Sequence, residues 1–232
     1  MKDFGISRSQ QKFGDRVVQS ANSLPLSGSL GLADAHELKH FATATEPPLS
    51  LVIFDRDGTL IEDTGYPINP AGLVWQPGAL KVIAWLRSQG FIVAVATNQS
   101  GVARGYFTLE QVEKFHAAMD TTIQAEGGRV DVYAICPHLI NGAVAEYAID
   151  CDCRKPTPGL INQLLEKFQV RPECAVLIGD RDTDVLAGQA AGVASFLYDG
   201  GDLFEFTLGA ISAKFALVAL SSVDVTSRAS RS

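Results

Sequence analysis

The sequence predicts an α/β fold built on a doubly wound parallel sheet. Two observations predict it. Short apolar runs of strand type alternate with helix-type segments, and several of these runs are apolar throughout, as in 51–54 (LVIF). Continuous apolar runs suit strands that are buried on both faces of a parallel sheet. Because ligands bind at the carboxyl ends of such strands, the polar residues that follow each run are the candidates for chemistry.

Five apolar runs are predicted as strands, and helix-type periodicity fills the intervals between them. Glycines end three of the predicted helices, as expected for residues that adopt a left-handed conformation easily. The predicted strands span residues 51–54, 91–96, 130–135, 175–178 and 194–198. The predicted helices span residues 79–89, 109–126, 160–168 and 185–191. Residues 203–221 predict one more helix and a last short strand.

The chain divides into two parts at about residue 48. Residues 1–48 are rich in Ser and Gly and show little hydrophobic periodicity, which predicts a flexible extension. Residues 49–232 carry the alternating pattern and are expected to form one folded domain.

Composition and charge argue against several classes of protein. The net charge of −7 and the pI of about 5.1 argue against a nonspecific nucleic-acid binder. The apolar runs are too short to span a bilayer, and the first residues lack the apolar core of a secretory signal. We therefore expect a soluble, cytoplasmic monomer that acts on a small molecule, with neither nucleic acid nor a membrane as partner.

Polar residues follow three of the predicted strands directly. Parallel strands end at the same edge of a sheet, so we expect these residues to lie close together. Gly58, just beyond the first pair, permits a sharp turn at the end of its strand. The three pairs are Asp55 and Asp57, Thr97 and Asn98, and Asp180 and Asp184.

The first pair predicts a metal site. Asp55 and Asp57 are two residues apart, and carboxylates this close repel each other unless a cation or a shared proton compensates. Mg2+ is the expected cation, because it takes oxygen ligands and keeps water sites open for phosphate. The predicted Mg2+ ligands are Asp55, Asp57 and Asp180.

The same edge of the sheet suits phosphoryl transfer. We expect Asp55 to attack phosphorus and to form an aspartyl-phosphate that water then hydrolyses. Asp57 would protonate the leaving oxygen and later activate the water. Thr97, Asn98 and Lys155 would offer a hydroxyl, amide donors and a positive charge to the phosphoryl oxygens.

A second constellation predicts a structural zinc site. Cys136-x-His138 is followed, after twelve residues, by Cys151-x-Cys153. Three thiolates and one imidazole are a regular ligand set for structural Zn2+. The alternatives are a disulfide, which a reducing compartment disfavours, and buried core cysteines, an interpretation that fits Cys174.

Zinc would also stabilise the segment that leads into the site of the carboxylates. It would close the loop between residues 136 and 153, and Arg154 and Lys155 follow that loop at once. We therefore expect zinc to support the site without taking part in hydrolysis.

The motifs resemble those of the haloacid dehalogenase (HAD) superfamily of phosphohydrolases, over about residues 50–200. The resemblance implies a Rossmann-type core and an Mg2+-dependent phosphatase. No insertion is long enough for a large cap domain, so an open site is expected. The stretches that match the four HAD motifs are Asp55-Arg56-Asp57-Gly58-Thr59, Thr97-Asn98, Lys155 and Gly179-Asp180-x-x-x-Asp184.

Within this superfamily the chain is similar to the group of heptose bisphosphate and histidinol phosphatases. Residues 63–66, 97–105 and 151–156 and the zinc-loop spacing match the heptose members. Arg181 stands where those members have Lys, and Ile61 where they have Asn. Arginine keeps the charge of lysine but changes its geometry. The fourth motif, with Arg181, is closer to that of the histidinol phosphatases.

The resemblance implies removal of the 7-phosphate of D-glycero-D-manno-heptose 1,7-bisphosphate. Histidinol phosphate stays open as the substrate, and so does a non-catalytic module that binds phosphorylated ligands. Arg154 would bind the second phosphate; the alternative is that it is a solvated loop charge. For Tyr66 the alternative to sugar binding is simple packing. His116 is expected on a helix surface. The implied substrate-binding residues are Asp63, Thr64, Gly65, Tyr66, Asn98, Gln99, Ser100, Arg154 and Arg181.

Overall fold

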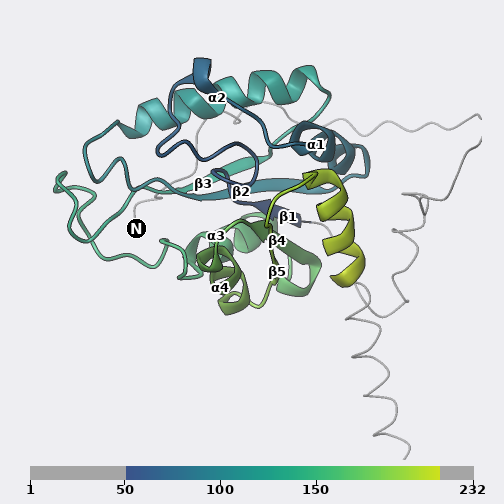
Figure 1. Cartoon of the computed structure of the whole chain (residues 1–232). Coiled ribbons are helices and arrows are strands. Elements are labelled where there is room, and N and C mark those ends of the chain that lie inside the picture. Colours follow the sequence, from purple (N-terminus) through teal and green to yellow (C-terminus); the bar gives the residue numbers. More distant parts are fainter. Residues whose placement is uncertain (1–50, 215–232) are drawn as a thin grey trace, which may run out of the picture.

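The structure is a computed structural model and describes residues 51–214. In this range five parallel strands form one sheet in the order β3-β2-β1-β4-β5 (Figure 1). The strands are β1 (Leu51–Phe54), β2 (Ile92–Asn98), β3 (Val132–Cys136), β4 (Ala175–Gly179) and β5 (Ala194–Leu197).

The first strand lies in the middle of the sheet. Phe54 of β1 is in register with Val95 of β2 on one side and with Ile178 of β4 on the other. The strand order runs outward from β1 in one direction for β2 and β3, and in the other for β4 and β5. The carboxyl end of β1 therefore lies at the point where the order reverses, where doubly wound sheets bind ligands.

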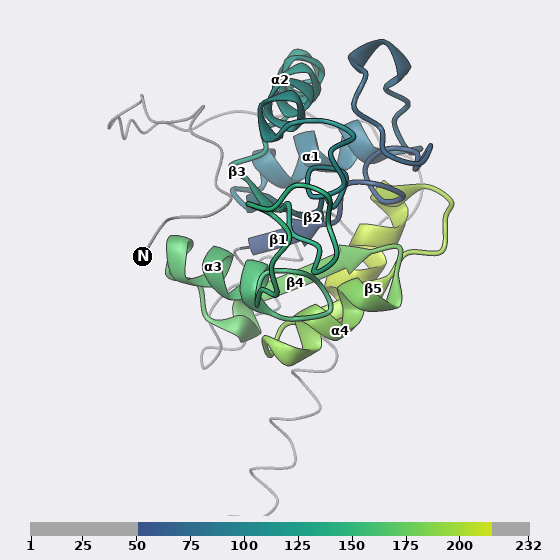
Figure 2. The same ribbon diagram turned by 90° about the vertical axis from the view of Figure 1, so that its left-hand side faces the viewer.

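Helices cover both faces of the sheet, with α1 and α2 on one face and α3 and α4 on the other (Figure 1). Side chains alternate along β1, so that Val52 and Phe54 join the core under α1 and α2, whereas Leu51 and Ile53 join the core under α3. The helices are α1 (Ala79–Ser88), α2 (Leu109–Ala125), α3 (Gly159–Phe168) and α4 (Asp182–Ala190). Residues 203–214 are also helical and pack on the first face (Figure 2).

The predicted alternation of strands and helices is confirmed, with shifted ends. Helix α4 begins three residues earlier than predicted, because the Asp184 carboxylate accepts a hydrogen bond from the Arg181 backbone N–H (3.0 Å) and caps the first turn. The predicted third strand starts two residues later than expected. The predicted extension and the last short strand lie outside the described residues. No helix among residues 51–214 is long and apolar enough to cross a membrane.

Candidate active site

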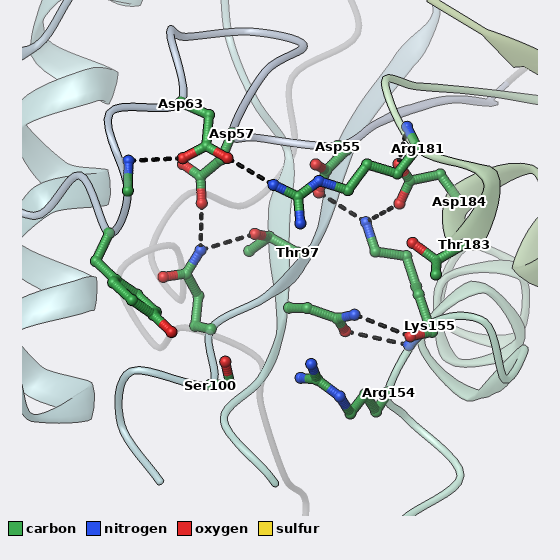
Figure 3. Close-up of a pocket in the computed structure, with 14 residues that line it drawn as sticks. Asp55, Asp57, Asp63, Thr97, Ser100, Arg154, Lys155, Arg181, Thr183 and Asp184 are labelled. Carbon is green, nitrogen blue, oxygen red and sulfur yellow. Dashed lines mark hydrogen bonds and ion pairs between the residues drawn. The ribbon is translucent and has the colours of Figure 1, made fainter. Parts of the chain in front are cut away.

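A cavity of about 390 Å3 opens at the carboxyl edge of the sheet (Figure 3). Strand ends, the loop after β1 and the segment after the cysteine loop all contribute to its wall. Thr183 and Asp184 line it as well, although neither was assigned a role from the sequence. The predicted site residues in its wall are Asp55, Asp57, Asp63, Gly65, Tyr66, Thr97, Asn98, Gln99, Ser100, Arg154, Lys155 and Arg181.

Lys155 lies at the centre of the buried charges. Its Nζ donates to Asp55 Oδ1, to Asp184 Oδ1 and to the Ala96 carbonyl oxygen, each at 2.6 Å. Burial alone would lower the pKa of Lys155, but the two carboxylates outweigh it, and the pKa is raised. Burial raises the pKa of Asp55, against the opposing charge of Lys155. Lys155 is therefore a fixed cation that leaves the second Asp55 oxygen available.

Three carboxylates converge beside this lysine. Asp55, Asp180 and Asp184 each offer an oxygen, and these oxygens lie within 4.8 Å of one another. Burial raises the pKa of Asp180 to about 6, and the neighbouring charges of Asp55 and Asp184 add to this shift. An all-oxygen set of this kind fits Mg2+.

The glycine of the first motif makes this approach possible. Gly58 has φ +86°, and a Cβ at this position would collide with the Asp180 carboxylate. The absence of a side chain thus lets the turn after β1 lie against the end of β4. The Thr59 hydroxyl donates to Asp180 Oδ1 over 3.4 Å, from the same turn.

The Asp57 side chain lies outside the group of three carboxylates. Its Oδ1 accepts from Arg56 Nε (2.8 Å), and its Oδ2 accepts from Arg56 Nη2 (3.0 Å) and Gln99 Nε2 (2.9 Å). Burial raises the pKa of Asp57, and Arg56 opposes this shift. The predicted ligand Asp57 brings no side-chain oxygen to this group, whereas the Asp184 carboxylate does. The last residue of the fourth motif was the signal that could have identified it.

Two predicted substrate-binding amides are engaged with the protein itself. Asn98 Nδ2 donates to the Lys155 carbonyl oxygen (3.0 Å), and Asn98 Oδ1 accepts from the Lys155 N–H (3.1 Å). Gln99 Nε2 joins Asp57 to the Thr97 hydroxyl, which accepts at 2.9 Å. These amides therefore hold the Lys155 backbone and the Asp57 carboxylate, whereas the sequence assigned them to substrate.

An ion pair crosses the mouth of the cavity. Arg181 Nη2 donates to Asp63 Oδ2 (2.6 Å), which links the start of α4 to the loop after β1. In that loop Tyr66 has φ +68° and meets the exposed Tyr106 edge to face, with ring centroids 5.1 Å apart. Thr64 is the only predicted substrate-binding residue that does not line the cavity.

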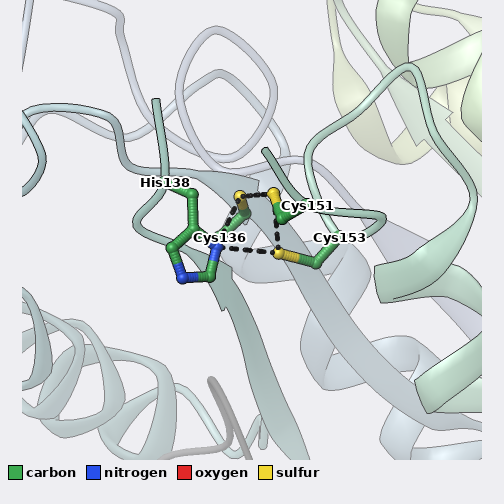
Figure 4. Close-up of side chains that lie close together, drawn as sticks. All are labelled: Cys136, His138, Cys151 and Cys153. Carbon is green, nitrogen blue, oxygen red and sulfur yellow. Dashed lines mark hydrogen bonds between the residues drawn. The ribbon is translucent and has the colours of Figure 1, made fainter. Parts of the chain in front are cut away.

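The four predicted zinc ligands meet at the end of β3 (Figure 4). The Cys151 sulfur lies 3.7 Å from that of Cys136 and 3.4 Å from that of Cys153, and His138 Nδ1 lies 3.2 Å from the Cys153 sulfur. Tetrahedral Zn–S bonds of about 2.3 Å place sulfurs roughly 3.7 Å apart, so the donor set fits Zn2+. All four cysteines, including the buried Cys174, are free of disulfides.

Comparisons with known proteins agree with this geometry. The family model for HAD-hydrolase-like proteins matches residues 152–219. The D-glycero-beta-D-manno-heptose-1,7-bisphosphate 7-phosphatase of Rhodopseudomonas palustris is 36% identical over 164 residues, which are 71% of this chain and 91% of that protein. The chain belongs to the heptose bisphosphate phosphatase family of HAD-like hydrolases. The same-named protein of Pasteurella multocida is 36% identical over 140 residues, 60% of this chain and 76% of its own length.

A solved structure is similar to this chain in fold as well as in sequence. It is that of D,D-heptose 1,7-bisphosphate phosphatase from B. bronchiseptica, complexed with magnesium and phosphate. Its TM-score is 0.59 at 32% identity, covering 69% of this chain and 86% of the other. The phosphatase described here therefore shares its overall fold with this structure.

Two buried residues of the phosphatase, Arg56 and His116, were assigned no role from the sequence. Arg56 is fully buried beside the cavity and bonds to Asp57. His116 was expected on a helix surface, and this prediction is wrong: it is 2% exposed, and burial lowers its pKa well below the usual range. Its place on the inner face of α2 follows the helical spacing of Val112, Phe115 and Met119, which the sequence shows.

Proposed function

We propose that this phosphatase removes the 7-phosphate of D-glycero-D-manno-heptose 1,7-bisphosphate through an aspartyl-phosphate. The observation that carries the proposal is the buried contact of Lys155 with Asp55 at the switch point of the sheet. It holds one carboxylate oxygen and leaves the other for attack on phosphorus. The names of the relatives support the substrate.

The two steps use Asp55 and Asp57 in turn. In the first step an Asp55 oxygen forms a bond to phosphorus, the bond from phosphorus to the sugar oxygen breaks, and Asp57 gives that oxygen a proton. In the second step water attacks the aspartyl-phosphate, Asp57 takes the proton of the water, and Asp55 leaves as a carboxylate. Thr97 and Lys155 are the groups proposed to contact the phosphoryl oxygens.

Two metals complete the proposal. Asp55 and Asp180, with Asp184 beside them, would hold Mg2+, which offsets the negative charge of the phosphoryl group and its nucleophile. The B. bronchiseptica phosphatase, whose structure is complexed with magnesium and phosphate, supports this assignment. The Cys3His cluster would hold a structural Zn2+ and keep the segment with Arg154 and Lys155 in place.

The substrate would extend from the carboxylates to the cavity mouth. Arg154 donates one bond to the His138 carbonyl oxygen (3.3 Å), which leaves other guanidinium donors for a second phosphate. The sugar would lie near Tyr66, Ser100 and the Asp63–Arg181 ion pair. Arg181 and Ile61 are the two positions that favour histidinol phosphate as the second candidate substrate.

The organisation of the chain is also part of the proposal. We propose that residues 49–232 form the catalytic domain, that residues 1–48 are an extension without a catalytic role, and that the enzyme works as a cytoplasmic monomer. Activity of a variant that begins at residue 49, measured beside the full chain and with its mass in solution, tests these points together.

The test of function is phosphate release by the full chain with Mg2+. Heptose bisphosphate and histidinol phosphate are compared side by side, and faster release from the heptose supports the proposed substrate. Asp55→Asn should abolish turnover and keep the wild-type circular dichroism. Undiminished turnover of Asp55→Asn would refute the mechanism. No release from either substrate would favour a non-catalytic module.

A further inference from the structure

Arg56 is the largest fully buried side chain of the described residues, and the proposed mechanism leaves it without a task. A buried guanidinium is costly unless its donors are satisfied. Its Nε and Nη2 grip the two oxygens of Asp57 at 2.8 and 3.0 Å. This two-pronged contact fixes the plane of the carboxylate as well as its place.

Contacts behind the guanidinium hold it in turn. Nη2 donates to the Pro67 carbonyl oxygen (3.2 Å), and Nη1 lies 3.1 Å from His116 Nε2 on α2. The Phe115 ring centroid is 5.0 Å from the guanidinium carbon. Arg56 is thus tied to the loop after β1 and to a helix that the cavity does not touch.

The contact with Arg56 determines the state of His116. A guanidinium has no acceptor, so Nη1 must donate and His116 Nε2 must accept, which places the imidazole proton on Nδ1. In a charged His116, Nε2 would also carry a proton, so two N–H donors and two positive charges would face each other. Burial and the charge of Arg56 lower the pKa of His116, in keeping with the neutral form.

The other side of the imidazole faces Tyr133 on β3. The two rings stack with centroids 4.2 Å apart and an interplanar angle of 13°, and the Tyr133 hydroxyl donates to Asp120. His116 Nδ1 has no hydrogen-bond partner in the described part of the chain. Stacking on Tyr133 holds the imidazole ring in place, and its contact with Arg56 is made through Nε2.

We propose that Arg56 and His116 are positioning residues for Asp57, with His116 aiming the Arg56 guanidinium and Arg56 aiming the carboxylate. The inference rests on the proposed function, in which Asp57 carries the proton to and from the reacting oxygens. A carboxylate free to rotate would present its proton to the leaving oxygen only part of the time. Arg56, together with Gln99, leaves it one orientation.

The test varies how much the reaction depends on that proton. A sugar phosphate has a basic leaving oxygen and needs protonation, whereas 4-nitrophenolate leaves without it. For heptose bisphosphate, His116→Leu should lower kcat on the order of 10- to 100-fold with KM little changed, a share of the general-acid contribution. The kcat for 4-nitrophenyl phosphate should fall by no more than about 3-fold, because that leaving group needs little general-acid help.

Three further variants separate positioning from loss of packing. His116→Gln keeps an acceptor for Nη1 and should restore most of the turnover that His116→Leu loses. Ile123→Ala removes a buried side chain from the same helix, roughly two turns further along, and should lower thermal stability with both substrates affected alike. Arg56→Lys, which cannot grip both oxygens, should resemble His116→Leu.

The possible failures are distinguishable. Equal loss of kcat on the two substrates, or a His116→Gln enzyme as impaired as His116→Leu, would overturn the positioning role. If the wild type does not cleave 4-nitrophenyl phosphate, two measurements with the sugar substrate decide the inference. His116→Gln must restore turnover, and His116→Leu must lower kcat with KM little changed; failure of either overturns the positioning role. A wild type that cleaves 4-nitrophenyl phosphate but not heptose bisphosphate overturns the proposed substrate alone, and the leaving-group comparison then uses phenyl phosphate.

Discussion

Asn98→Ala tests whether the asparagine at the end of β2 holds the protein together or binds the substrate. Its side chain makes two hydrogen bonds, of 3.0 and 3.1 Å, with the Lys155 backbone. Each such bond contributes about 0.5–1.5 kcal/mol net, so their loss should lower the free energy of unfolding by about 1–3 kcal/mol. The Lys155 backbone would also lose the contact that places its side chain against Asp55.

The catalytic effect should appear in kcat. A misplacement of about 1 Å in a catalytic group costs on the order of 100-fold, so a 10- to 100-fold loss of kcat is expected for Asn98→Ala, with KM changed little. A direct contact between Asn98 and the phosphate of bound substrate would instead raise KM.

The assays are urea unfolding followed by circular dichroism and steady-state phosphate release. Asn162→Ala, an exposed substitution of the same kind on α3, is the matched control and should change stability by less than about 0.5 kcal/mol. An Asn98→Ala protein with wild-type stability and kcat but a raised KM would refute the reasoning.

Three further predictions concern a turn, a metal and a buried acid. Gly58→Ala should raise the Mg2+ concentration needed for half-maximal activity by on the order of 10-fold, because its Cβ would push the Asp180 carboxylate away; Gly127→Ala, at φ +78° in open space and outside the cavity wall, should leave that concentration unchanged. Elemental analysis should find zinc in the wild type and in Cys174→Ser but not in Cys153→Ser, which lacks one of the four proposed ligands. Burial raises the pKa of Asp120 to about 6, so ionisation of this carboxyl destabilises the folded state increasingly as the pH rises from 4 to 6. Asp120→Asn should therefore have the free energy of unfolding of the wild type at pH 4 and a value about 1–2 kcal/mol higher at pH 8, as measured by urea unfolding.

The strands and helices were predictable because their periodicity records which faces are buried. The apolar run of β1 identified a strand covered on both sides, and its four residues are fully buried. The ends of elements were less predictable, since a cap depends on one contact. The start of α4 is set by the bond from Arg181 N–H to Asp184, a residue assigned from the sequence only to the fourth motif.

The chemistry of the residues also indicated which of them gather at the site, but not the directions of their side chains. Asp55, Lys155 and Asp180 follow from strand ends and motifs, because parallel strands end at one edge. The turn of Asp57 toward Arg56, and of Asn98 toward the Lys155 backbone, depends on partners that only the folded chain brings into place. No spacing rule contains those contacts.

The sequence by itself therefore determined the fold class, the carboxylate Asp55 that follows β1 and the Cys3His set, because each depends on residue type and local spacing. Only the tertiary structure decided how the charges are paired. Lys155 meets Asp55 and Asp184, and Arg56 is held by His116 from α2. The physical reason is that a buried charge must find its partner wherever folding brings one, and folding joins residues that are distant in sequence.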